Sequence, residues 1–102
     1  MVPVVVVKLG AEGAMAQRGG NRFVSSATTV DVVDPVGAGD SFDAGFLHQF
    51  LRGGDLQSSL TAGNVTAALS TTRAGGTEAF RDSEYRNRFL QNHRQDRVVW
   101  NL

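Results

Sequence analysis

The sequence DPVGAGDSFDAGFL, at positions 34–47, marks where the chain changes from one kind of structure to another. Before it, short runs rich in Val and Thr alternate with Gly-containing turns, which is typical of strands and tight turns. After it, apolar residues recur every three or four positions, which is typical of a buried helical face. The sequence therefore predicts one α/β unit with strands first and helices second.

The first third of the sequence predicts four extended segments. They cover residues 2–8, 13–17, 23–26 and 28–34, with Gly-containing turns between the first three. Because these connections are short, we expect neighbouring strands to pair antiparallel. The first segment is so rich in Val that it predicts a strand covered on both faces, like a central strand of an α/β sheet. A chain that begins with such a strand is expected to lack some of the strand's neighbours.

Three helices are expected after the junction. The first ends at Gly53 and has an apolar face formed by Phe42, Ala44, Phe46, Leu47, Phe50 and Leu51. Asp55 caps the second, whose small residues at 62–72 would let it lie close to a sheet or a ligand. The third starts at Asp82 and carries Tyr85, Phe89 and Leu90 on one face. Residues 96–102 are expected to form an extended tail.

Composition indicates an ordinary globular domain and does not indicate binding to highly charged partners. The 102 residues, 41% apolar and 20% charged, fit a single domain over residues 1–102. Ten basic residues balance ten acidic ones, so no general field attracts nucleic acid or a membrane. The apolar run at the start is far shorter than the roughly 20 residues that span a bilayer, and no signal peptide is expected. The absence of cysteine excludes thiol chemistry and fits a cytoplasmic protein.

The junction has the composition of an anion site followed by an acid. Glycine tolerates conformations that align successive amides, and the first amides of a helix lack partners within it. The amides of Gly37, Ala38 and Gly39 would therefore suit a phosphate. The carboxylate of Asp40 would repel that anion unless a hydroxyl lay between them. Asp40 would then accept the hydroxyl proton during phosphoryl transfer, which is the chemistry of a phosphotransferase acting on an alcohol.

A simpler interpretation of these four residues stays open. Gly-x-Gly before an acid can form a turn followed by a capping residue, and such short motifs are weak evidence of function. The sequence also lacks the Gly-Lys-Ser/Thr of a Walker A loop and the third glycine of a dinucleotide fingerprint.

The longer sequence at 34–47 closely resembles the carboxy-terminal signature of the ribokinase-like (PfkB) family of carbohydrate kinases. The residues that fit the signature are Asp34, Gly37, Ala38, Gly39, Asp40, Phe42, Ala44, Gly45 and Phe46. VVVVKLGAEGAM, at 4–15, resembles the family's strand and Gly-x-x-Gly turn, and AGNVTAALSTTRAGGTEAF, at 62–80, resembles its later helix and loop. The resemblance implies the carboxy-terminal part of a three-layer α/β/α fold.

The resemblance also implies roles for the residues of the junction. Asp40 matches the catalytic base that takes the proton from the sugar hydroxyl. Gly37, Ala38 and Gly39 match the anion hole around the transferring phosphate. ATP would be the phosphoryl donor, and Mg²⁺ would accompany it by bridging phosphate oxygens.

Four further positions resemble the ATP site of the family. Lys8, Gly10 and Gly13 match positions near the ATP phosphates and ribose, and Asn64 matches a position near the adenine. Each has a structural alternative: the glycines can simply shape a turn, Asn64 can be a packing amide, and Lys8 can be a solvated charge at the end of a strand.

The last implied site is for a monovalent cation such as K⁺. Asp34, the backbone of Val36 and the loop around Gly75 match the cation site found in many members of the family. The alternative is that Asp34, which precedes a proline, only sets a turn.

Kinases of this family are longer, and an amino-terminal part that has no counterpart here supplies most of their sugar pocket and lid. The chain is therefore expected to be a carboxy-terminal segment that carries the ATP side and the catalytic base and is inactive alone. The alternative is a nucleotide- or anion-binding module without catalysis, in which Asp40 only caps the helix. An exposed sheet edge would favour a homodimer. These residues do not identify the sugar or nucleoside.

Overall fold

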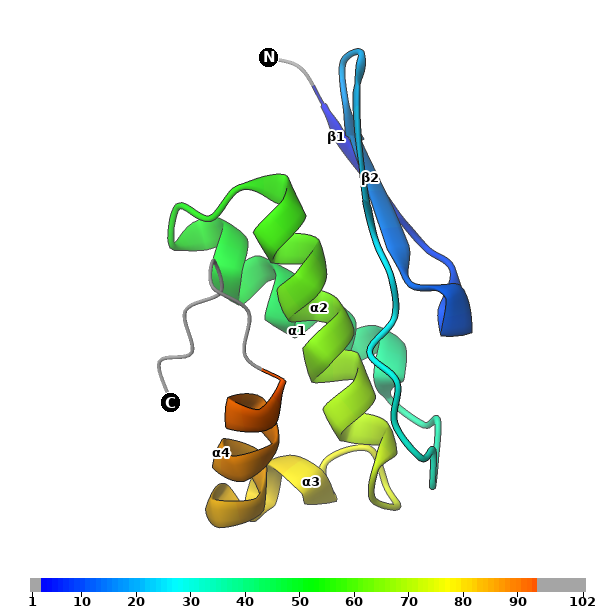
Figure 1. The fold of residues 1–102 in the computed structure, drawn as a ribbon, viewed down its shortest axis with the longest axis vertical. Helices are drawn as coiled ribbons and strands as arrows, with labels where there is room; N and C mark the ends of the chain where they lie inside the picture. The colour runs from blue at the N-terminus through cyan, green and yellow to red at the C-terminus, as the bar shows by residue number, and fades with distance from the viewer. Residues whose placement is uncertain (1–2, 94–102) are drawn as a thin grey trace.

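Three antiparallel strands form the first part of the chain, which the computed structural model describes over residues 3–93 (Figure 1). β1 (Val4–Lys8), β2 (Ala14–Arg18) and β3 (Asn21–Ser25) lie in the order β1-β2-β3. One turn of 3-10 helix, η1 (Gly10–Glu12), joins β1 to β2, and a two-residue turn joins β2 to β3. The predicted antiparallel pairing of these strands is confirmed.

The Val-rich strand β1 is covered on one face only, so the predicted burial of both faces is wrong for this structure. Val4 and Val6 pack against the core, whereas Val5 and Val7 remain 56% and 40% exposed. Side chains alternate between the faces of a strand, and the described helices cover only one face of this sheet (Figure 1). Valine content therefore indicated the strand correctly but not its surroundings.

Residues 28–34, predicted as a fourth strand, form none. The amides of Val33 and Asp34 donate instead to the carbonyl oxygen of Thr71, at 2.7 and 3.0 Å. The three described strands pair only with one another, so this β-prone segment has no ladder within residues 3–93. It runs as an irregular loop past the end of α2.

Two long helices follow, α1 (Ala38–Leu51) and α2 (Leu56–Thr71), and they lie side by side against the sheet (Figure 1). As predicted, Asp55 caps α2, its carboxylate accepting the Ser58 amide at 2.8 Å. The helices approach closely because glycine lies at their contact. A Cβ at Gly45 would lie 2.7 Å from the Ala62 carbonyl oxygen.

The core lies between the sheet and these two helices. Its buried residues are Ala14, Ala16, Phe42, Phe46, Leu56 and Leu60. The inward face of α1 follows Phe42 at spacings of three, four and seven residues, which buries Gly45, Phe46 and Gln49. Three residues predicted on that face, Ala44, Leu47 and Leu51, point outward instead. Gly45 and Gln49 were missed because neither counts as apolar.

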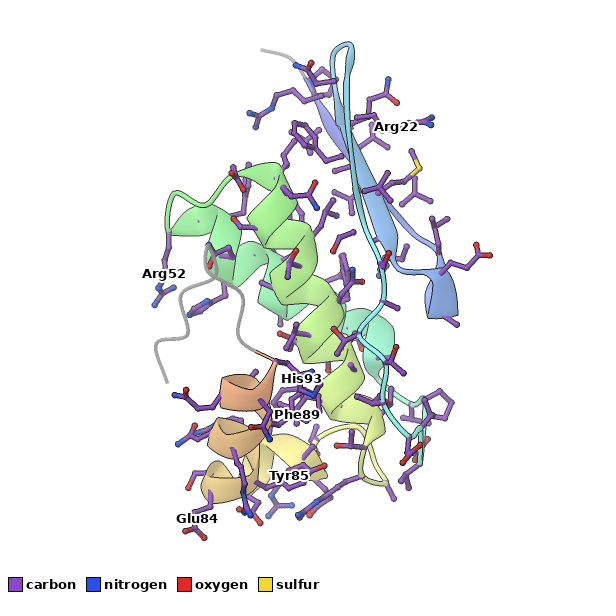
Figure 2. The ribbon with its side chains drawn as sticks, in the orientation of Figure 1. Arg22, Arg52, Glu84, Tyr85, Phe89 and His93 are labelled. Atoms are coloured by element: carbon purple, nitrogen blue, oxygen red, sulfur yellow. The ribbon has the colours of Figure 1, made fainter. Side chains whose placement is uncertain are left out.

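Two shorter helices pack at the far end of α2: α3 (Glu78–Arg81) and α4 (Ser83–Asn92). Asp82 caps α4 as predicted, accepting the Tyr85 amide at 3.0 Å, whereas the single turn of α3 was not predicted. A second core joins them to α2 through Val65, Leu69, Ala79 and Leu90, and the predicted face residues Tyr85 and Phe89 pack against it (Figure 2). The predicted tail at 96–102 lies outside the described residues. Within residues 3–93, every helix is too short or too polar to cross a membrane.

Candidate active site

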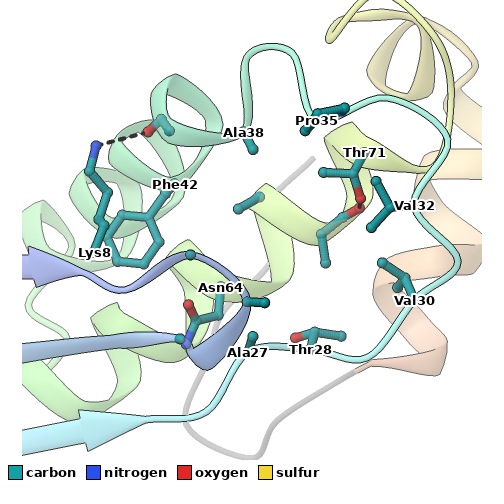
Figure 3. Close-up of a pocket in the computed structure, with 16 residues that line it drawn as sticks. Lys8, Ala27, Thr28, Val30, Val32, Pro35, Ala38, Phe42, Asn64 and Thr71 are labelled. Atoms are coloured by element: carbon teal, nitrogen blue, oxygen red, sulfur yellow. Dashed lines mark hydrogen bonds between the residues drawn. The ribbon is translucent and has the colours of Figure 1, made fainter.

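A cavity of about 340 Å³ lies where the end of β1, η1, the loop at 27–35 and the two long helices meet (Figure 3). Six of the predicted site residues line it: Lys8, Gly10, Gly13, Ala38, Gly39 and Asn64. These residues come from three segments that are distant in sequence, 8–13, 38–39 and 64. The structure therefore brings the ATP-type positions and part of the anion hole into one pocket.

The first turn of α1 presents unpaired amides beside this pocket. Gly37 precedes the helix with a φ of 79°, a conformation that favours glycine, and its carbonyl accepts the Ser41 amide at 2.9 Å. Within residues 3–93, the amides of Gly37, Gly39 and Asp40 have no hydrogen-bond acceptor. The Ala38 amide differs, because it donates to the Pro35 carbonyl at 3.2 Å. Free donors at a helix start, together with the helix dipole, favour an anion there.

Asp40 lies in the same turn, and its side chain is exposed. No other described residue within 3–93 hydrogen bonds to or forms an ion pair with its carboxylate. Asp40 directly follows Gly39, which lines the pocket. The carboxylate is therefore free to accept a proton from a hydroxyl held next to the start of α1.

Lys8 reaches from the end of β1 to this turn. Its Nζ donates to the Gly39 carbonyl at 3.4 Å (Figure 3) and lies 3.1 Å from Oδ1 of Asp43. The side chains of the pair are 44% and 57% exposed, so the ion pair itself stabilises little. The pairing holds a positive charge beside the pocket, while Lys8 stays exposed at the end of β1, as the structural alternative also expects. Asp43 was missed from the sequence, although it follows Gly39 by one helical turn.

The Gly10–Gly13 turn has both a packing role and a place at the pocket. Gly13 has a φ of 109°, and a Cβ on it would overlap the Ser25 carbonyl and lie 2.7 Å from the Ala27 amide. Only glycine permits this approach, so the structural role of Gly13 is clear. Gly10, with a φ of 61°, has open space around it.

Asn64 is buried and joins α2 to the end of β3. Its Nδ2 donates to the carbonyl oxygens of Ser25 and Ser26, at 3.0 and 3.1 Å. Asn64 also lines the pocket, so the packing and the ligand interpretations do not exclude each other.

Asp34 connects the loop before α1 to the glycine loop after α2. Its two carboxylate oxygens accept the amides of Val36 and Gly75, each at 3.0 Å. These hydrogen bonds, from Gly75 first and Val36 second, lower the pKa of Asp34 below its usual value of 3.8. The two loops touch: a Cβ on Gly76 would lie 2.7 Å from the Val36 carbonyl oxygen.

The residues of the predicted monovalent-cation site, Asp34, Val36 and Gly75, lie on these two loops. Residues 3–93 contain no group of three or more His, Cys, Asp or Glu side chains suited to a metal. Both oxygens of the one carboxylate among them, that of Asp34, accept backbone amides. Magnesium would depend mainly on phosphate oxygens of a nucleotide.

Much of the pocket wall was not predicted as a site. Ala27, Thr28, Val30 and Val32 line it from the loop that was predicted as a strand. The small residues of α2 were an exception, because we expected them to let the helix lie close to a sheet or a ligand. Two of them, Ala67 and Ala68, line the pocket.

Comparison with known proteins identifies the family. A model described as "pfkB family carbohydrate kinase" matches residues 1–83, and the chain belongs to that family. It is 38% identical over 77 residues to an uncharacterized sugar kinase of Archaeoglobus fulgidus, covering 76% of this chain and 31% of that protein.

Solved kinases share the fold. Aminoimidazole riboside kinase from Salmonella enterica, complexed with aminoimidazole riboside and an ATP analog, matches with a TM-score of 0.74 at 33% identity. The match covers 85% of this chain and 31% of that one. A fructokinase double mutant from Vibrio cholerae, with fructose, ADP and potassium ion bound, matches with a TM-score of 0.71 at 29% identity, over 83% of this chain and 30% of that one. The chain thus spans less than a third of the length of these relatives.

Proposed function

We propose that the chain carries the ATP side and the catalytic base of a kinase that phosphorylates a hydroxyl of a sugar or a related small molecule. One observation carries this proposal. The start of α1, the Gly10–Gly13 turn and Asn64 meet at one pocket, and Asp40, whose carboxylate is unpaired within residues 3–93, directly follows Gly39 of the pocket lining. The Salmonella enterica relative, which holds an ATP analog and a riboside, supports the choice of donor and acceptor.

In the proposed reaction, Asp40 accepts the proton of the acceptor hydroxyl as the hydroxyl oxygen attacks the terminal phosphorus of ATP. The bond from that phosphorus to the bridging oxygen breaks, and ADP leaves. The amides of Gly37 and Gly39 stabilise the charge on the transferring group, and Lys8 adds a positive charge beside them. Mg²⁺ supplies charge neutralisation on the phosphates when bound.

A monovalent cation would be held by Asp34, Val36 and the loop at Gly75. The potassium-bound fructokinase supports K⁺ as the ion. Its effect would be indirect, because these loops position the residues that precede α1.

The substrate side is proposed to lie outside this chain, which matches only 31% of the Archaeoglobus fulgidus relative. We therefore expect negligible sugar phosphorylation by the 102 residues alone. A steady-state assay that shows robust turnover on a sugar would contradict this.

Amide NMR tests the nucleotide site directly. ATP with Mg²⁺ is added to the ¹⁵N-labelled chain, and the peaks of Gly10, Gly37, Gly39, Asp40 and Asn64 are followed. Shifts confined to the pocket are the expected result. A well-dispersed spectrum whose peaks do not shift when ATP is added would contradict the proposal.

A chimera tests the base. Residues 3–93 would replace the matching segment of the Salmonella enterica kinase, and an active chimera would then receive Asp40→Asn. We expect kcat to fall about 10²- to 10⁴-fold with ATP affinity retained, because proton transfer is lost while the amides remain. Asp31→Asn, which changes another exposed carboxylate, is the matched control and should keep full activity. Unchanged activity of Asp40→Asn would remove the base role and favour a non-catalytic nucleotide-binding module; Asp40 does not cap α1, because Gly37 precedes the helix and no side chain caps it.

A further inference from the structure

We propose that Arg73 is a positioning residue that holds the glycine loop (residues 74–77) against α4 and, through this loop, positions the start of α1. The inference rests on the proposed function, since it assumes that the phosphates of a nucleotide bind at the start of α1. It deepens that function by giving α4 a part in nucleotide affinity, although the residues of α4 lie outside the pocket lining.

The guanidinium of Arg73 makes two contacts with α4 and its cap. Its Cζ lies 3.9 Å from the centroid of the Tyr85 ring, which is a close cation–π contact. Its Nη1 lies 3.5 Å from Oδ2 of Asp82. The side chains of this ion pair are 40% and 46% exposed, so the pair stabilises little by itself and the stack on Tyr85 is the main restraint. A planar guanidinium can stack on a ring and pair with a carboxylate at once, whereas a lysine ammonium has no flat face to stack.

The partners of Arg73 are held in place by the rest of the structure. Oδ1 of Asp82 accepts the Tyr85 amide at 3.0 Å, so the carboxylate that pairs with Arg73 also caps α4. Tyr85, on α4 (Figure 2), packs against the second core, in which Leu69 of α2 and Leu90 of α4 are buried. Arg73 therefore connects the glycine loop to a part of the chain whose position is set by packing.

The glycine loop itself is weakly restrained. Gly75 and Gly76 have φ values of 91° and 77°, and glycine reaches many other conformations at low cost. Thr77, which ends the loop before α3, makes no side-chain cap hydrogen bond. The side chain of Arg73 therefore gives the start of the loop an anchor that the loop backbone does not provide.

On its other side, the glycine loop contacts the residues that precede α1. The Gly75 amide donates to the Asp34 carboxylate at 3.0 Å. Gly76 is buried, and a Cβ on it would lie 2.7 Å from the Val36 carbonyl oxygen and 3.6 Å from Cα of Gly37. The amide of Gly37 belongs to the proposed phosphate site, so a shift of the loop reaches this site through a single contact.

ATP affinity measured on matched arginine variants tests this role. Dissociation constants for ATP with Mg²⁺ are measured by NMR titration, together with the amide shifts of Gly37 and Gly75 in the free chain. We expect Arg73→Gln to weaken ATP binding about three- to tenfold and to shift both amide peaks. Arg81→Gln is the matched control, because Arg81 also forms an exposed ion pair, with Glu78 at 3.0 Å, but that pair lies within α3. The control should keep its ATP affinity within about twofold of the unmodified chain.

The outcomes separate this inference from the proposed function. Unchanged ATP affinity in Arg73→Gln, while the unmodified chain binds ATP, would overturn the inference and leave the proposed function intact. A lower melting temperature of Arg73→Gln without a change in ATP affinity would make Arg73 a stabilising residue only and would likewise overturn it. Failure of the unmodified chain to bind ATP would overturn both.

Two variants of Tyr85 repeat the test without a change in the loop. Tyr85→Phe keeps the ring, so it should bind ATP as the unmodified chain does. Tyr85→Leu keeps an apolar side chain against the second core but removes the ring, so it should weaken ATP binding about as much as Arg73→Gln. Equal ATP affinity of the two Tyr85 variants would overturn the inference. If Arg73→Gln fails to fold, this pair of variants decides the inference alone.

Discussion

Asp34 stabilises the site through a charged group that holds two loops together. Its carboxylate accepts the amides of Gly75 and Val36, so the ionised form is favoured in the folded chain and its pKa lies below 3.8. A group with a depressed pKa contributes stability above its unfolded pKa and loses this contribution as the pH falls through its folded pKa. The stabilisation from these two hydrogen bonds should therefore be fully present at pH 7 and decrease below about pH 3.8.

Asp34→Asn tests whether the Asp34 carboxylate stabilises the chain through these two hydrogen bonds. An amide has one acceptor oxygen, so one of the two N–H groups would lose its partner. We expect Asp34→Asn to have a lower melting temperature than the unmodified chain at pH 7. This difference in melting temperature should become smaller as the pH falls below 3.8. Circular dichroism melts over this range provide the measurement, with Asp31→Asn as the exposed control. A gap that stays constant with pH would show that the carboxylate charge is not involved.

Several features of the candidate site were predictable because they depend on local backbone geometry. Glycines at the start of a helix and a following acid predict unpaired amides and a free carboxylate wherever the helix lies, and Gly37, Gly39 and Asp40 show this. Asn64 was less predictable, because its two acceptors, Ser25 at the end of β3 and Ser26 just after it, lie 39 and 38 residues away. The Lys8–Asp43 pair depends in the same way on how β1 meets α1.

At the scale of elements, the contact between α1 and α2 depends on glycines. A Cβ on Gly45 would overlap the Thr66 hydroxyl and lie 2.7 Å from the Ala62 carbonyl oxygen, which is backbone and cannot turn away. Gly45→Ala should therefore push the helices apart. We expect a loss of about 2 kcal/mol in the free energy of unfolding, even though alanine favours a helix more than glycine does.

Urea unfolding of Gly45→Ala and of a matched control variant measures this loss in the free energy of unfolding. Gly20→Ala is the control, because a Cβ there meets no atom within 4 Å and the φ of Gly20 lies outside the left-handed region. Its stability should stay within about 0.5 kcal/mol of the unmodified chain. Equal stability of the two variants would contradict close packing at Gly45.

Helices with their own capping residues were predictable, as were three strands joined by short turns, whereas the segment 28–34 was wrongly predicted as a strand. Asp55 and Asp82 cap α2 and α4 where the sequence indicated. The segment 28–34 has strand composition but no neighbouring strand, so its amides bond to the end of α2 instead. Residue composition gives only the local preference for extended backbone. A strand forms only where a neighbouring strand is present to pair with it, and composition does not show this.

At the scale of the whole molecule, the sheet is half covered. The described helices pack on one face, while Val5, Val7 and Val24 stay exposed on the other. The sequence predicted the strands from their valines, but burial depends on what packs against them, which valines alone do not specify. Within residues 3–93, β1 is an edge strand, and an edge strand of a half-covered sheet is prone to pair with another chain.

We expect the chain to self-associate through the free edge of β1. Light scattering coupled to size-exclusion chromatography should show a concentration-dependent dimer. Val5→Lys should shift it to the monomer, because a lysine on an edge strand opposes strand pairing. Val24→Lys is the matched control: Val24 is similarly exposed, at 58% against 56%, and lies on the same face, but on β3 at the opposite edge of the sheet. A monomer at every concentration would contradict the prediction. Equal disruption by both variants would mean that copies pack face to face rather than edge to edge.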